Sequence, residues 1–327
     1  VFYFPFDFSQ VMKRAIKNIS PAIILLMELE VWPNLVQIAN KKNIPVVVVN
    51  GRISDRSFPR YKIIKFATNW MFSKLALTLA QTNQYARRFI KLGCDENKVI
   101  VTSSLKYDTA QTTGSITGAD TLKRQLNLSY EKLFVIGGTG PGEEKTAIDI
   151  FTKLKQDPQL KDLRMAIIPR KPERFAEVAQ LIAQSSFDFI RLSTIKADEK
   201  NLSTKPAIIL GDTMGDLKKF YAIATVVFVG RTLTPMGGSD MMEPTALGKC
   251  TIFGPHTFNF RQTVKALLNE NGAIQVKDAE RLYKIARKCL TDNDYAQSIG
   301  AKGQEIIMKN QGATQKTVDA IKPLLSR

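Results

Sequence analysis

The feature that most constrains the fold is a series of short, β-branched apolar runs whose apolar residues follow one another without alternating. Strands of this kind are covered on both faces, as in a parallel sheet between two layers of helices. Segments of helical period separate the runs, so the sequence predicts an α/β fold with doubly wound parallel sheets. The runs occupy residues 22–27, 45–50, 75–81 and 98–104, and then 132–138, 164–170, 187–193, 207–212, 225–230 and 250–255.

A polar, Gly/Thr-rich stretch at 108–121, DTAQTTGSITGADT, divides this series, and Ile116 is its only large aliphatic residue. Such a composition is typical of a linker, so we predict two Rossmann-like domains, 1–112 and 113–327. We expect the helices from about residue 278 onward to return toward the first domain. The first domain shows only four clear strands and opens inside the strand-like stretch VFYFPFD. We therefore expect it to be incomplete at its N-terminus.

The formal net charge of +17 attracts polyanions, phosphate-bearing substrates and acidic membrane surfaces. Residues 1–112 are the more basic part, with 16 Lys plus Arg against 7 Asp plus Glu. A generally soluble basic protein is the alternative interpretation. The stretch 58–75 mixes basic residues with Tyr61, Phe66 and Trp70. It could lie on an anionic membrane surface or equally pack an apolar face into the core.

Cysteine and histidine usage excludes several kinds of site. The three cysteines, Cys94, Cys250 and Cys289, are far apart, which argues against a disulfide framework and a zinc site. His256 is the only histidine, so a histidine triad or a multi-histidine metal centre is impossible. No apolar run approaches the roughly 18 residues that span a bilayer.

The ends of the predicted strands in the second domain carry candidate binding residues, because doubly wound sheets bind ligands outside the carboxyl ends of their strands. The glycine-rich stretch 137–144, GGTGPGEE, includes Thr139 and Gly140 and leads into a helix whose first N–H groups could face an anion. It matches neither a Walker nor a dinucleotide fingerprint, and an ordinary glycine-rich turn is the alternative. Arg170 ends the next strand and could hold a phosphate through two parallel hydrogen bonds, or be an exposed loop arginine.

Two further strand ends add to this set. Met214 and Gly215 follow the strand at 207–212. Gly237 and Gly238 allow backbone conformations and a close ligand approach that a Cβ would block. Glu243 could accept both hydroxyls of a ribose, or could simply be an acid placed favourably at a helix start. Four convergent ends favour a nucleotide pocket.

In the first domain, Glu28 and Glu30 follow the strand at 22–27. If the backbone stays extended there, residues two apart share one side, and the two carboxylates could orient or deprotonate a hydroxyl group. The stretch 50–57, NGRISDRS, follows the next strand and is either an anion-binding loop or a solvated surface loop.

In this order, the motifs resemble those of the 3-deoxy-D-manno-octulosonic acid (Kdo) transferases of lipopolysaccharide biosynthesis, which have the GT-B glycosyltransferase fold. The resemblance spans almost the whole chain. The matching stretches are MELEVWPN (27–34), NGRISDRS with Tyr61 beyond it, TSSLKYD (102–108), IPRKPERF (168–175), GDTMGDL (211–217), GGSDMMEPTALG (237–248) and FGPHTFNF (253–260).

The resemblance implies two Rossmann-like domains facing across a cleft and an inverting transfer of Kdo from CMP-Kdo to a lipid A precursor. It implies no metal ion and no other cofactor, and a peripheral location at the cytoplasmic face of the bacterial inner membrane, against an anionic surface. Glu30 and Glu28 would position the acceptor. Acceptor-binding candidates are Asn34, Arg52, Ser54, Ser57 and Tyr61, and donor-binding candidates are Thr139, Gly140, Arg170, Met214, Gly215, Gly237, Gly238, Ser239, Asp240 and Glu243.

The sequence departs from the family pattern at two places. Family members usually carry a preceding segment with a membrane-anchoring helix and a Gly-Glu motif whose glutamate is taken as the catalytic base. The sequence given does not contain that preceding segment, so we expect this chain by itself to have little or no transferase activity. The usual His-Asn after the glycine pair is replaced by Ser239-Asp240, and an Asp facing a phosphate would be repulsive.

Two alternative functions remain at this level. One is a GT-B transferase that uses a UDP-sugar in lipid A assembly, which competition by CMP against UDP would distinguish. The other is a non-catalytic anion- or nucleic-acid-binding protein, whose affinity would fall steeply with salt and ignore nucleotide identity. The sequence shows no RNA-binding signature, so we expect no nucleic-acid partner.

Overall fold

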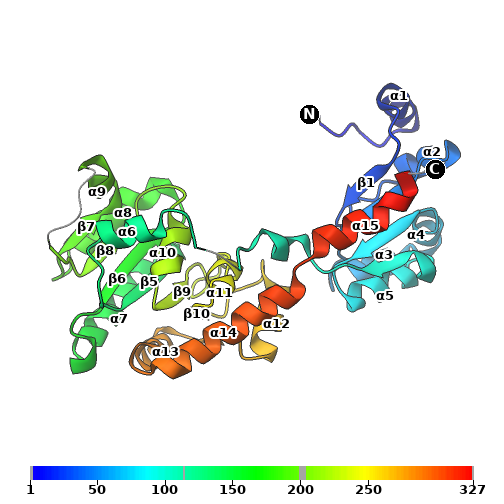
Figure 1. Ribbon diagram of the computed structural model, residues 1–327. Helices are drawn as coiled ribbons and strands as arrows, with labels where there is room; N and C mark the ends of the chain where they lie inside the picture. The colour runs from blue at the N-terminus through cyan, green and yellow to red at the C-terminus, as the bar shows by residue number, and fades with distance from the viewer. Residues whose placement is uncertain (1–2, 113–114, 199–203, 326–327) are drawn as a thin grey trace. The chain divides into compact units, whose positions relative to one another are not determined.

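The computed structural model describes residues 3–112, 115–198 and 204–325 (Figure 1). Its contacts divide the chain into two compact units, which we call unit 1 (residues 1–109 and 310–327) and unit 2 (residues 110–309). Each unit contains one parallel sheet.

Unit 1 contains a four-stranded sheet in the order β1-β2-β3-β4, and every neighbouring pair is parallel. All four strands fall on predicted runs, which confirms this part of the sequence analysis. The strands are β1 (Ile24–Met27), β2 (Val46–Gly51), β3 (Leu77–Ala80) and β4 (Val99–Val101). The helices of unit 1 are α1 (Ser9–Ile19), α2 (Pro33–Lys41), α3 (Ser57–Ile63), α4 (Lys65–Phe72), α5 (Asn83–Lys91) and α15 (Ala313–Leu325), with short 3-10 helices at Glu96–Lys98 and Leu105–Thr109.

The packing of strand β2 on both of its faces explains why its sequence is apolar without alternation. Val46 and Val48 belong to a core that includes Phe72 and Phe89, which come from α4 and α5. On the opposite face, Val47 and Val49 pack in a second cluster that contains Ile321 of α15. All residues of β2 are buried, as expected for a parallel strand between two layers.

The C-terminal helix belongs to unit 1, so the predicted second domain of 113–327 differs from unit 2 as observed. The carboxylate of Asp108 accepts hydrogen bonds from the N–H groups of Gly312 (2.7 Å), Ala313 (3.3 Å) and Thr314 (2.5 Å). These N–H groups lie at the start of α15, where a helix has no internal acceptors for them. Asp108 therefore attaches α15 to unit 1. The order of the elements along the chain does not reveal these contacts.

Unit 2 contains a seven-stranded parallel sheet in the order β11-β10-β9-β5-β6-β8-β7. The six predicted runs all form strands, and β11 was missed because it is only two residues long. The strands are β5 (Leu133–Thr139), β6 (Arg164–Pro169), β7 (Phe189–Arg191), β8 (Ile208–Leu210), β9 (Val226–Val229), β10 (Cys250–Phe253) and β11 (Ile274–Gln275).

Helices follow most of these strands, and α7, α8 and α13 contribute to the large core on one face of the sheet. Strand β5 lies between β9 and β6, so the strand order reverses at β5 and β9, and ligands of doubly wound sheets bind outside such a point. The helices of unit 2 are α6 (Ala119–Gln125), α7 (Glu143–Lys155), α8 (Phe175–Ala183), α9 (Leu192–Asp198), α10 (Leu217–Ile223), α11 (Met242–Ala246), α12 (Arg261–Asn269), α13 (Ala279–Thr291) and α14 (Asn293–Asn310), with 3-10 helices at Pro158–Leu160 and Pro172–Arg174. Within the described ranges, no helix is both long and apolar enough to cross a membrane.

Replacing Asp108 by Ala is expected to destabilise unit 1 by about 1–2 kcal/mol, because three N–H groups at the start of α15 lose their acceptor. Burial would raise the pKa of Asp108, but the hydrogen bonds from residues 312–314 outweigh it and lower the pKa. The stabilisation is therefore present above the unfolded pKa of about 3.9 and is lost as pH falls through the lower folded value. Hydrogen exchange at residues 312–314 measures this, with Asp319→Ala within α15 as the control. Unchanged protection in Asp108→Ala would contradict the proposed attachment.

Candidate active site

The buried carboxylate of Glu143, at the start of α7, joins the loops that follow β5 and β9 (Leu133–Thr139 and Val226–Val229). It accepts hydrogen bonds from the N–H groups of Gly140 (3.0 Å), Thr232 (2.9 Å) and Leu233 (2.9 Å), and a fourth from Arg231. The residue is only 2% exposed, so each of these bonds lies in a region of low polarity. Consecutive N–H groups of this kind form an anion-binding cup, and here the protein's own carboxylate occupies it.

The neighbouring Glu144 fixes the same loop from the other side. Its carboxylate accepts a bond from the hydroxyl of Thr139 (2.7 Å) and forms a two-armed ion pair with Arg174 (2.5 and 3.2 Å). Burial lowers the pKa of Arg174, but its hydrogen bonds to Glu144 and Glu177 outweigh that effect and raise the pKa above its usual range. The pair is buried and fully hydrogen-bonded, which is the condition under which burying two charges is tolerated.

These contacts change the interpretation of the glycine-rich loop. We expected the N–H of Gly140 to be available to an anion. In the structure this N–H already donates to the carboxylate of Glu143. The Thr139 hydroxyl is likewise bonded to Glu144, and Thr139 is 1% exposed. A Cβ at Gly140 would lie 2.5 Å from the sulfur of Met236, so packing explains this glycine. The loop is a fixed wall of the site.

The glycine pair after β9 has the left-handed backbone that was expected, with φ of +88° at Gly237 and +90° at Gly238. A Cβ at Gly237 would lie 2.4 Å from the side chain of Asn259, so this position is filled by protein atoms. At Gly238 a Cβ would meet only ordinary contacts, and the backbone conformation alone requires glycine there. The Ser239 hydroxyl donates to the carbonyl of Gly138 (2.7 Å), which turns this side chain inward.

Five charged or polar residues gather beside these loops, and we call them the Glu243 cluster: Arg170, Lys218, Tyr221, Asp240 and Glu243. Lys218 lies 3.4 Å from a carboxylate oxygen of Glu243. Burial raises the pKa of Glu243, and the negative charge of Asp240 raises it further, while Lys218 and Arg170 partly offset the rise. The carboxylate of Asp240 also accepts the N–H of Met242 (2.8 Å) at the start of α11. The structure thus brings together three of the predicted donor-binding residues.

Tyr221 and Lys218 of α10 were missed by the sequence analysis. The Tyr221 side chain is fully buried, and among the described residues its hydroxyl has no hydrogen-bond partner. Burial raises its pKa well above the usual value, as do the charges of Glu243 and Asp240. A buried hydroxyl without a partner is unusual in proteins. The stretch LKKFYAI itself has the pattern of an ordinary helix and gives no local signal.

The turn after β8 contributes an exposed edge. Met214 is 68% exposed, and Gly215 has a φ of +86° with open space where a Cβ would be. The turn is held by Asp216, whose carboxylate pairs with Lys196 (2.6 Å) and Lys219 (3.0 Å). Met214 and Gly215 are therefore exposed after a strand end, and their contact with a donor stays a prediction.

In unit 1, the expected placement of Glu28 and Glu30 on one side is wrong. Strand β1 ends at Met27, and Glu28 has a φ of +54° rather than extended backbone. The N–H of Glu30 donates to the carbonyl of Met27 (3.0 Å), so the chain turns between the two acids. Glu28 instead lies 3.8 Å from Arg52, while Glu30 is close enough to Tyr61 for its charge to raise the pKa of that phenol in addition to burial. Each acid is therefore paired with a different predicted acceptor residue.

The other predicted acceptor residues are partly engaged within unit 1. The side-chain amide of Asn34 donates to the carbonyl of Asp7 (2.6 Å) and accepts from the Ser9 hydroxyl (2.6 Å). The hydroxyls of Ser54 and Ser57 lie 2.8 Å apart, and Ser54 also accepts the N–H of Ser57 (3.0 Å). Asn34 thus holds the N-terminal segment, and the two serines shape the start of α3 (Ser57–Ile63).

Comparison with known proteins agrees with this architecture. A glycosyltransferase from Rickettsia africae is 16% identical and covers 97% of this chain and 80% of its own, with a TM-score of 0.58. The C-terminal CMP-Kdo binding domain of WaaA from Acinetobacter baumannii is 27% identical and covers 58% of this chain and 95% of its own, with a TM-score of 0.53. The two parallel, helix-covered sheets and these similarities define a protein of the GT-B fold.

The family follows from the sequence comparisons. Residues 1–109 match the family model of 3-deoxy-D-manno-octulosonic-acid transferase (kdotransferase). The 3-deoxy-D-manno-octulosonic acid transferase of Haemophilus influenzae is 33% identical over 327 residues, which is all of this chain and 75% of that protein. The Bordetella pertussis transferase is 28% identical over 99% of this chain and 74% of its own length. The chain belongs to the Kdo transferase family, which confirms the resemblance seen in its motifs.

Replacing Glu143 by Gln is expected to destabilise unit 2 by roughly 2–4 kcal/mol, because the amide supplies one acceptor oxygen where four N–H groups converge. Urea unfolding measures the effect, and Glu173→Gln, at a carboxylate with a 65% exposed side chain, is the matched control. Equal unfolding midpoints for the two variants would show that Glu143 does not hold the loops.

Replacing Glu243 by Gln is expected to stabilise unit 2 near neutral pH. Because the folded state raises the pKa of Glu243, the stabilisation from its protonated form is present below the unfolded pKa of about 4.3 and is lost as pH rises through the folded value. The always neutral Gln should therefore melt above the wild-type protein at pH 7, and the difference should vanish near pH 4. Thermal unfolding across this range, with the exposed Glu270→Gln as control, tests it. A difference that persists at low pH would contradict the explanation.

Proposed function

We propose that this chain carries the donor- and acceptor-binding parts of an inverting, metal-independent transferase that moves Kdo from CMP-Kdo to a lipid A precursor in lipopolysaccharide synthesis. The observation that carries the proposal is the similarity of this chain to the Acinetobacter baumannii domain, which is a CMP-Kdo binding domain. That protein covers 58% of this chain at 27% identity, and the Glu243 cluster is in unit 2.

The charges of the Glu243 cluster suit a nucleoside monophosphate. Arg170 follows β6 (Arg164–Pro169) directly and is exposed, so its guanidinium is available to a phosphate. Glu243 offers carboxylate oxygens to the two hydroxyls of a ribose, and Lys218 is paired with it rather than with a phosphate. Asp240, in place of the usual family residue, caps the start of α11, so it need not face the phosphate.

The proposed reaction is a direct displacement at the anomeric carbon of Kdo. CMP leaves with the electron pair of the broken glycosidic bond, and Arg170 stabilises the negative charge on its phosphate. The acceptor hydroxyl forms the new bond to the anomeric carbon and gives its proton to a carboxylate base. Glu30 positions this hydroxyl, with Glu28 as the second carboxylate in this region. Tyr61 lies near Glu30, and its proximity supports an acceptor site in unit 1.

We also place the chain at the cytoplasmic face of the bacterial inner membrane, bound peripherally to an anionic surface. The support is the surface of α3 and α4 (Ser57–Ile63 and Lys65–Phe72), where Ile63 is 83% exposed and Phe66 is 93% exposed. Basic residues of the same two helices flank them: Arg60, Lys62 and Lys65. Exposed apolar residues flanked by cations are typical of segments that lie in the interface of an anionic bilayer.

Calorimetric titration with CMP, and with UMP and AMP as controls, tests the donor. We expect saturable binding that favours CMP and that weakens by about tenfold or more in Arg170→Ala and in Glu243→Ala, because each removes a charged hydrogen-bonding group. Arg124→Ala, at an exposed arginine of α6, is the matched control and should bind CMP as the wild type does. Equal affinity for the three nucleotides, or no CMP binding by a folded chain, would contradict the proposal.

A further inference from the structure

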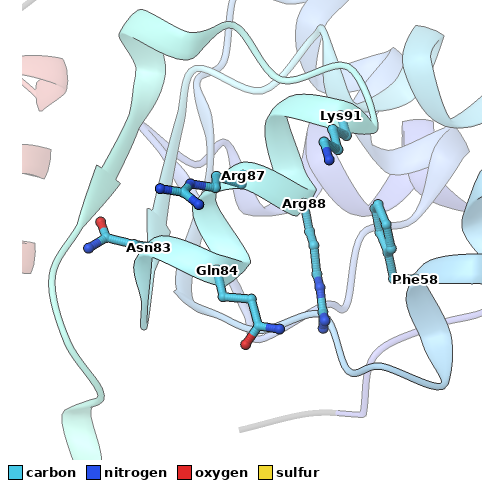
Figure 2. Close-up of a pocket in the computed structure, with 6 residues that line it drawn as sticks. All are labelled: Phe58, Asn83, Gln84, Arg87, Arg88 and Lys91. Atoms are coloured by element: carbon cyan, nitrogen blue, oxygen red, sulfur yellow. The ribbon is translucent and has the colours of Figure 1, made fainter.

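One face of α5 (Asn83–Lys91) borders a groove of about 290 Å³ in unit 1 (Figure 2). The groove is closed on one side by Phe58 of α3 (Ser57–Ile63), which Figure 2 shows beside the side chain of Arg88. Its lining residues on α5 follow the helical period and so share one side of the helix: Asn83, Gln84, Arg87, Arg88 and Lys91. The six lining residues include three cations and no acid.

Arg88 is a fixed wall of this groove. Its guanidinium donates to the carbonyl of Ile53 (2.5 Å), pairs with Asp55, and lies 5.5 Å from the ring centre of Phe58. The Arg88 side chain is only 12% exposed, so its position is set by these contacts. They also fix the groove against the loop 50–57, which carries predicted acceptor-binding residues.

Arg87 and Lys91 are the cations left for a ligand. Both are exposed, and in the part of the chain that the structure describes neither side chain forms a hydrogen bond or an ion pair. The groove also includes the first turn of α5, which has no acidic residue. Free cations, a positive helix end and a preformed hollow together favour an anion with several acceptor oxygens.

We propose that this groove binds the phosphate group of a lipid headgroup. Its volume is at the small end of the roughly 300–1,000 Å³ of ligand pockets, so it suits a headgroup rather than a whole lipid. The cations of the groove lie on α5, whereas α3, which supplies Phe58 to the groove, ends at the exposed Ile63, so an exposed apolar residue lies on a helix that borders the cationic groove. A lipid presents the matching pair, a phosphate and apolar chains. The inference rests on the proposed function only in taking the phosphate from a lipid.

Vesicle co-sedimentation tests the groove. The probes are phosphatidylcholine vesicles with and without phosphatidic acid, and the variant is Arg87→Ala/Lys91→Ala. We expect its affinity for phosphatidic acid vesicles to fall roughly thirtyfold, as when two cations lose contact with an anionic surface. Lys41→Ala/Lys42→Ala removes two exposed cations elsewhere in unit 1 and should change the affinity less than twofold. An equal loss in the two variants, or no loss in the groove variant, would overturn the proposal.

Further arms separate the sources of the phosphate. Vesicles with a phosphorylated lipid A precursor, matched in phosphate content, assign the groove to the acceptor if they bind more tightly and to the bilayer if they bind equally. Inorganic phosphate should compete in either case at constant ionic strength, and a failure to compete would overturn phosphate recognition. Lys91→Arg should retain binding. CMP titration of the groove variant reports on unit 2, so loss of the donor proposal and loss of this one are distinguishable.

Discussion

The site of unit 2 depends on one interaction, the acceptance of four backbone N–H groups by the carboxylate of Glu143. The strand order reverses at β5 and β9, and the loops after these strands would carry unpaired N–H groups without an internal acceptor. A carboxylate at the start of α7 satisfies them and is in turn favoured by the helix end. The geometry of the loops is therefore set before any ligand binds, which is the preorganisation that binding and catalysis need.

Because a carboxylate occupies the anion-binding cup, ligand charge has to be matched elsewhere. In the proposed function Arg170 supplies the positive charge, because Lys218 is paired with Glu243, and the buried hydroxyl of Tyr221 has no partner among the described residues. The raised pKa of Glu243 shows that the folded state holds this carboxyl at a cost in stability. Groups that lower stability and gather at a strand end are typical of binding sites. At such positions function, rather than folding, explains why the residue is present.

Much of the fold and part of the site could be predicted from sequence. Continuous apolar runs gave ten of the strands, and only the two-residue β11 escaped, because so short a strand has no hydrophobic pattern. Arg170 and Glu243 were predicted from their places after a strand and at a helix start, and Asp240 from the resemblance to the family. The prediction that Glu28 and Glu30 lie on one side was wrong. It assumed an extended backbone, whereas Glu28 adopts a left-handed conformation. Tyr221 and Lys218 were missed because the sequence around a helical residue does not indicate what the end of its side chain contacts.

Hydrophobic periodicity and ordered motifs are local properties of the chain, so they were sufficient to predict the class of fold, the order of the elements and the family. Which groups are free to bind depends instead on contacts between distant parts of the chain. Glu143 meets Leu233 ninety positions along the chain, and Asp108 meets Gly312 across more than two hundred. Contacts at such separations depend on strand order and on the packing of α7 and α15, so they decide whether a polar group is already satisfied or remains available to a ligand.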